Sequence, residues 1–83
     1  MEGPVHLRLE FRMPRPASTP KSRTPPAIKR PDLDKLIRAV LDALGSAGVY
    51  RDDSQVTRID ATKVLAAVDG SPGLLITIRQ SIL

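Results

Sequence analysis

Two pairs of aspartates in this sequence have the residue type and spacing that a divalent-cation site requires. Asp32 and Asp34 are separated by one residue at the start of a segment with periodic apolar residues, and Asp52 and Asp53 are adjacent after a glycine-containing segment. Mg²⁺ binds proteins through one or two carboxylates together with phosphate oxygens and water. Three of these carboxylates around one point would favour metal-assisted phosphodiester chemistry.

The first pair also has a structural interpretation. Asp32 follows Pro31 and precedes the periodic run, so it suits the N-cap of a helix, and Asp34 would lie in the first turn, where the helix dipole stabilises negative charge. Asp52 and Asp53 are harder to explain in this way, because a β-branched run begins directly after them and acidic residues are depleted in strands. Successive strand residues point to opposite faces, so only one acid of that pair can face a metal.

An amphipathic helix over about residues 33–44 is the element expected to position the first pair. Its apolar residues recur with the i, i+3, i+4, i+7 spacing of one helix face, and Gly45 or Gly48 is a natural end. If the strand that follows Asp53 lies beside the beginning of this helix, one acid of the second pair meets Asp32 and Asp34. The residues of the apolar face are Leu33, Leu36, Ile37, Val40, Leu41 and Leu44.

Further segments have the pattern of strands. Residues 5–11 alternate strictly between apolar and polar side chains, residues 56–67 have two mixed faces typical of an edge or interface strand, and residues 74–79 follow a turn over 68–73. We expect the last two strands to pair as an antiparallel hairpin. His6 lies on the polar face of the first strand, where we interpret it as a solvated residue. The sequence therefore predicts an α+β fold, a small mixed sheet with a β-hairpin and one main amphipathic helix, in a single domain over 1–83.

Residues 12–30 are rich in proline and basic side chains without a regular period, so we expect a loop or mobile arm. Residues 11–31 carry a net charge of +6, whereas the rest of the chain carries −2, which together give +4. This charge would offset the repulsion between the aspartates and a nucleic-acid backbone. The alternative is a solvated linker without a partner. The candidate DNA contacts are Arg15, Lys21, Arg23, Lys29, Arg30 and, in the helix, Lys35.

The composition limits the possible classes of protein. The 83 residues include only two aromatic side chains, so we expect one aliphatic core that a dimer would help to complete. Because the chain has no cysteine, a disulfide, a zinc–thiolate site and a thiol nucleophile are excluded. The sequence has no apolar run long enough to cross a membrane and no signal-peptide pattern, so we expect a soluble cytoplasmic protein without membrane partners.

Around the two acid pairs the sequence resembles the RusA family of Holliday-junction resolvases, which carry a Pro-Asp-x-Asp helix start and a later Asp-Asp-Ser/Ala-Gln segment. These correspond here to residues 31–34 and 52–55, and the likeness covers roughly residues 4–79, with Leu-Asp-Ala-Leu at 41–44 and Tyr-Arg at 50–51. The resemblance implies a homodimeric, Mg²⁺-dependent endonuclease that resolves four-way DNA junctions by paired nicks in recombination and repair. It also implies that Asp32, Asp34 and Asp53 are metal ligands. Asp52 is the next candidate, because only one acid of the adjacent pair can face the metal.

The sequence departs from the family pattern in its basic residues. The family usually has a lysine one helical turn after the second aspartate, where this chain has Arg38, and Lys35 stands where asparagine is frequent. Arg38 or Lys35 would stabilise negative charge on the reacting phosphate, although Arg38 can also form a surface ion pair with Asp34.

Three alternatives to a resolvase stay open. Family members typically begin with several tens of further residues, so the chain can be a branched-DNA-binding protein that does not cut. A second alternative is a nuclease for other DNA intermediates such as flaps. The third is a small dimeric protein-interaction module whose aspartates serve only as caps.

Overall fold

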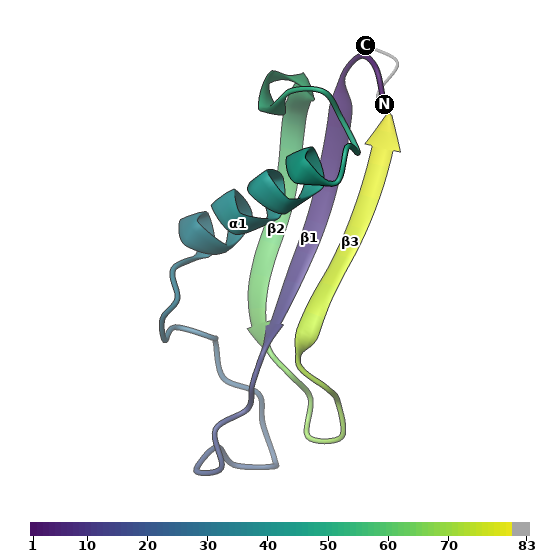
Figure 1. Cartoon of the computed structure of the whole chain (residues 1–83). Coiled ribbons are helices and arrows are strands. Elements are labelled where there is room, and N and C mark those ends of the chain that lie inside the picture. Colours follow the sequence, from purple (N-terminus) through teal and green to yellow (C-terminus); the bar gives the residue numbers. More distant parts are fainter. Residues whose placement is uncertain (81–83) are drawn as a thin grey trace.

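The computed structural model describes residues 1–80, which form a mixed sheet of three strands with α1 on one of its faces (Figure 1). Within those residues, the predicted α+β fold with a small mixed sheet and one main helix is confirmed. Residues 81–83, the end of the predicted domain, lie outside the described residues. The elements are β1 (Val5–Met13), α1 (Leu33–Ser46), the short 3₁₀ helix η1 (Asp53–Gln55), β2 (Val56–Leu65) and β3 (Gly73–Gln80).

β1 is the central strand, and its alternating pattern supplies the deepest part of the core. Val5, Leu7 and Leu9 are 0%, 0% and 1% exposed, and Phe11 continues the same buried row. The polar side chains between them face the other side of the sheet because strand residues alternate. β1 has a hydrogen-bonded neighbour at each edge, since the strand order is β2-β1-β3.

The expected hairpin between the last two strands is wrong, because β2 and β3 lie on opposite sides of β1. β1 pairs with β2 in parallel and with β3 in the antiparallel sense, so Val5 lies between Val56 and Gln80. The turn-like segment at 66–72 connects the two outer strands past the end of β1 (Figure 1). The mixed faces of residues 56–67 had suggested an edge strand, and β2 does form an edge of the sheet.

α1 lies over β2 and β1 through its predicted apolar face, with Val40 7% exposed at the centre of the contact (Figure 1). The helix continues two residues beyond the predicted end and stops in a Schellman motif. In this motif Gly48 has φ 77° and donates its N–H to the Gly45 carbonyl at 3.1 Å, while Val49 donates to the Leu44 carbonyl at 3.1 Å.

The residues from 1 to 80 include no helix that combines the length and apolar character needed to cross a membrane.

Candidate functional site

Asp32 and Asp34 lie where α1 begins, and both side chains are exposed. Asp32 occupies the predicted N-cap position, and its carbonyl accepts the Leu36 N–H at 3.2 Å, but its carboxylate makes no capping hydrogen bond. The Asp32 carboxylate therefore does not cap the helix, although it stands at the N-cap position. Two solvent-open carboxylates in this arrangement match the donor set of Mg²⁺, which needs one or two carboxylates together with a phosphate.

Asp52, in contrast, caps a helix with its side chain. Its carboxylate accepts the Ser54 N–H at 2.8 Å, and the side-chain oxygen of Gln55 accepts the Asp52 N–H at 3.1 Å, which together form a capping box at η1. The hydrogen bond from Ser54 holds the pKa of Asp52 below its ordinary value. The Gln55 amide nitrogen also donates to the Met1 and Gly3 carbonyls, so this segment is tied to the start of β1.

Asp53 lies at the far end of α1. One of its carboxylate oxygens is 3.7 Å from the place where a Cβ on Gly45 would be, so a glycine at this position lets the segment approach the helix. The neighbouring Tyr50 is buried and donates its hydroxyl to the Leu41 carbonyl at 2.8 Å. Burial, and then the negative charges of Asp53 and Asp42, raises the pKa of Tyr50. Asp42 is thus a further carboxylate whose charge acts on Tyr50, and sequence reasoning did not select it.

α1 separates the two acid pairs. Asp34 and Gly45 are 11 residues apart, and a helical rise of 1.5 Å per residue puts roughly 16 Å between them. Within residues 1–80, no three acidic or histidine side chains lie close enough to hold a metal ion. The expected meeting of Asp53 with Asp32 and Asp34 therefore does not occur within one chain, while their assignment as metal ligands stays a prediction. The reason is the direction of β2, whose beginning lies near the end of α1 rather than near its start (Figure 1).

The basic side chains predicted to contact DNA divide into two groups. Lys21, Arg23, Lys29, Arg30 and Lys35 are exposed. The half-buried Arg15 instead organises the proline-rich loop: its guanidinium donates to the Pro20 carbonyl at 2.7 Å, to Thr24 Oγ1 at 3.0 Å, to the Ala66 carbonyl at 3.2 Å and to the Arg23 carbonyl. Its predicted contact with DNA stays a prediction, but in this structure its two terminal NH₂ groups bind the protein, while its buried Nε has no hydrogen-bond partner.

Arg38 is exposed one helical turn after Asp34, and the ion pairs within residues 1–80 do not include a contact between the two.

Lys63 was not singled out from the sequence. Its Nζ donates to the Lys29 carbonyl at 2.7 Å and to the Pro31 carbonyl at 3.0 Å, so it fixes the backbone that leads into Asp32. The sequence did contain an indication of this role, since Lys63 stands on the face of β2 whose neighbouring residues are apolar and pack against the core.

Comparison with protein families gives a match over residues 1–79 to the model described as endodeoxyribonuclease RusA. The matched part includes both acid pairs, Arg38 and the proline-rich loop. Comparison with curated proteins gives no match.

Proposed function

Because the chain belongs to the RusA family of Holliday-junction endodeoxyribonucleases, we propose that it cuts four-way DNA junctions by Mg²⁺-dependent hydrolysis and makes paired nicks as a homodimer. Family membership supports endonuclease chemistry on junction DNA in general. The observation that carries the finer proposal is the exposed pair Asp32 and Asp34, where the carboxylate at the N-cap makes no capping bond.

Each side chain near the start of α1 has a distinct part in the proposed reaction. Asp32 and Asp34 would hold the cation against a phosphate oxygen, and Mg²⁺ at such a site polarises the phosphodiester and acidifies a bound water. Arg38, exposed one turn later, would stabilise the negative charge that develops on the phosphate oxygens. Lys63 keeps the approach to Asp32 in one conformation by binding the Pro31 carbonyl.

A second copy of the chain is needed to bring Asp53 to this site, because one copy holds it at the opposite end of α1. In a two-fold dimer with antiparallel α1 helices, the start of one helix lies beside the end of the other. Asp53 of each copy would then join Asp32 and Asp34 of the other. The two resulting sites are equivalent by symmetry, as paired cuts in opposed strands of a junction require.

Cleavage of a labelled synthetic four-way junction tests the proposal. With Mg²⁺, wild type is expected to nick two opposed strands of the junction and to leave a linear duplex intact, while EDTA abolishes the nicks. We expect Asp34→Asn and Asp53→Asn each to reduce cleavage at least about a hundredfold, because each removes a charge from the proposed ion site. Asp52→Asn is the matched control, since asparagine keeps the capping oxygen. Junction binding without nicks by wild type would refute the proposed cleavage.

Mixed dimers test the shared site. When Asp34→Asn and Asp53→Asn chains are co-expressed, each mixed dimer has one site with both changes and one site with neither. We therefore expect recovery of single nicks, but not of paired nicks, in the mixed preparation. If all ligands of a site came from one chain, every site would carry one of the two changes and the mixture would stay inactive.

A further inference from the structure

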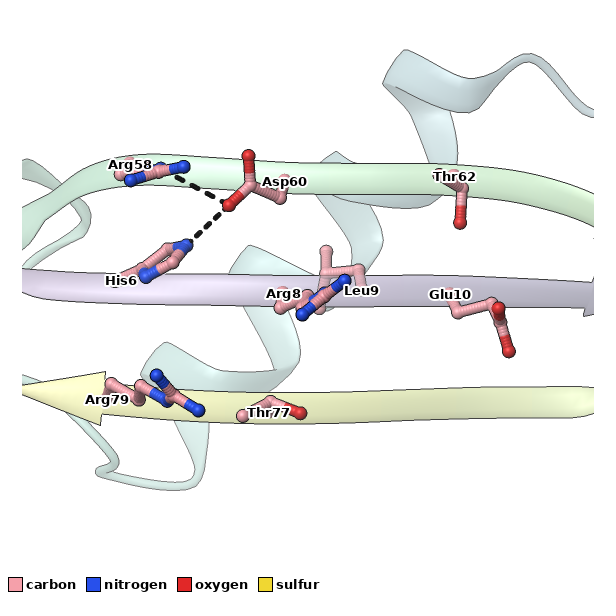
Figure 2. Close-up of a pocket in the computed structure, with 9 residues that line it drawn as sticks. All are labelled: His6, Arg8, Leu9, Glu10, Arg58, Asp60, Thr62, Thr77 and Arg79. Atoms are coloured by element: carbon pink, nitrogen blue, oxygen red, sulfur yellow. Dashed lines mark hydrogen bonds and ion pairs between the residues drawn. The ribbon is translucent and has the colours of Figure 1, made fainter.

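The sheet face opposite α1 carries a polar groove that the proposed site does not use (Figure 2). The groove encloses about 680 Å³ and runs across all three strands described within residues 1–80. Figure 2 shows its polar side chains standing on one side of the sheet, with α1 behind it. Arg8 from β1, Arg58 from β2 and Arg79 from β3 bring guanidinium groups to this face.

The acidic side chains of the groove are already compensated by cations. Asp60 Oδ2 lies 2.6 Å from His6 Nε2 and 3.2 Å from Arg58 Nε, and Glu10 Oε2 lies 2.7 Å from Arg12 Nε. Among residues 1–80, Arg8 and Arg79 form none of the ion pairs, and both side chains are exposed. The lining side chains carry three arginine charges and two carboxylates, and Arg12 beside Glu10 brings the excess on this face of the sheet to two positive charges. The two arginines without an ion-pair partner are Arg8 and Arg79.

The sheet register places these two charges within reach of one chain of phosphates. Arg79 is paired with His6, and Thr77 is paired with Arg8, so the two arginines lie in adjacent rows of the same face on neighbouring strands. Strands are about 4.8 Å apart, and same-face residues along a strand are about 7 Å apart. A guanidinium presents a planar set of donors that matches phosphate oxygens, and the Thr77 hydroxyl adds a donor beside Arg8 on the neighbouring strand (Figure 2).

We propose that this groove is a second DNA-contact surface, in which Arg8 and Arg79 bind the phosphate backbone of a duplex arm. The choice of DNA as the ligand rests on the proposed function and on the positive excess of the groove. Asp32 and Asp34 lie at the start of α1, and this helix is on the other side of the sheet from the groove (Figure 2). The surface therefore contributes affinity without sequence preference, as phosphate contacts do.

The test is a salt series of DNA binding in EDTA, measured by fluorescence anisotropy with a labelled junction and a labelled duplex. The variants are Arg8→Gln, Arg79→Gln, the corresponding changes to Lys, and Arg51→Gln. Arg51→Gln is the charge-matched control, because its guanidinium is ion-paired with Glu2 at 2.6 Å and it does not line the groove. Thermal melts of each variant check that the fold is retained.

We expect each glutamine variant in the groove to weaken binding of both DNAs about five- to tenfold at 0.1 M salt and to reduce the salt slope by about 1. The lysine variants should keep the slope because they keep the charge. An equal loss in Arg51→Gln, unchanged binding in the groove variants, or no DNA binding by wild type would overturn the proposal. Because no cleavage is involved, a wild type that binds through the groove but never cuts would refute only the proposed catalysis.

Discussion

Asp60 is in contact with His6 and with the guanidinium of Arg58, so its ionisation is linked to folding. The hydrogen bond with His6 is the main cause that lowers the pKa of Asp60, and the charge of Arg58 acts in the same direction. A carboxyl group whose pKa is lower in the folded than in the unfolded state stabilises the fold above its unfolded pKa. That contribution is lost as the pH falls through the folded pKa.

We therefore expect Asp60→Asn to melt at a lower temperature than wild type at pH 6, and this difference to shrink as the pH falls below the ordinary aspartate pKa of about 3.9. Thermal melts over this pH range measure it. Asp69→Asn, in the segment between β2 and β3, is the control and should differ little from wild type throughout. If the melting temperature of Asp60→Asn is below that of wild type by the same amount at every pH, the carboxylate charge does not cause the difference.

Lys63 links two elements, since it stands near the end of β2 and binds the backbone just before α1. Lys63→Met keeps the aliphatic stem but removes both hydrogen bonds to carbonyl groups. We expect a loss of about 1 kcal/mol in the free energy of unfolding, because hydrogen bonds from a charged donor contribute roughly this much at a partly exposed site. Urea unfolding measures it, with Lys35→Met on the exposed face of α1 as the control. Equal stability of the two variants would contradict this role.

Local pattern was sufficient to predict α1 and β1, because each has the period of its own backbone geometry. The two outer strands were predictable from their β-branched residues and the turn between them. The pairing was not predictable from the turn at 68–73, whose composition is equally suitable for a hairpin and for a connection around another strand. The strict alternation of β1 did contain a signal. A strand with an apolar row as continuous as Val5, Leu7 and Leu9 is best stabilised at the centre of a sheet.

The candidate site was predictable only in part for the same reason. The residue types and the place of Asp32 at the N-cap follow from local sequence. Whether Asp53 meets Asp32 depends on the direction of β2 relative to α1, which local sequence does not define. The different surroundings of Asp52 and Asp53 depend on η1, a short element formed by side-chain hydrogen bonds with no periodic signature.

The molecule as a whole is elongated, with dimensions of 45 × 21 × 17 Å. Its radius of gyration is 14.8 Å, whereas a compact chain of this length would have about 12 Å. The open shape reflects a sheet whose apolar face is only partly covered by α1. By register with Leu9 and Phe11, Ile76 and Leu74 of β3 point to the α1 side, yet they are 40% and 41% exposed.

We expect a second copy to cover this uncovered part of the sheet beside α1. Sedimentation velocity at micromolar concentration should then give a dimer for wild type and a monomer for Leu74→Glu/Ile76→Glu, because a charge on each apolar side chain opposes its burial. Leu75 is 49% exposed but pairs with Glu10 on the groove face, so Leu75→Glu is the matched control and should stay dimeric. A monomeric wild type would contradict both this interface and the shared site.

The central position of β1 also affects how the chain folds. β1 is synthesised first, but its partners β2 and β3 follow only after the long loop and α1, and the pairing of Val5 with Gln80 closes a loop of nearly the whole chain. Pairing at such a separation in sequence is slow, because the entropy of loop closure is lost before the strands gain their contacts. Until then the Val, Leu and Phe row of β1 has no neighbouring strands to cover its edges, so we expect misassembly during refolding to begin at this strand.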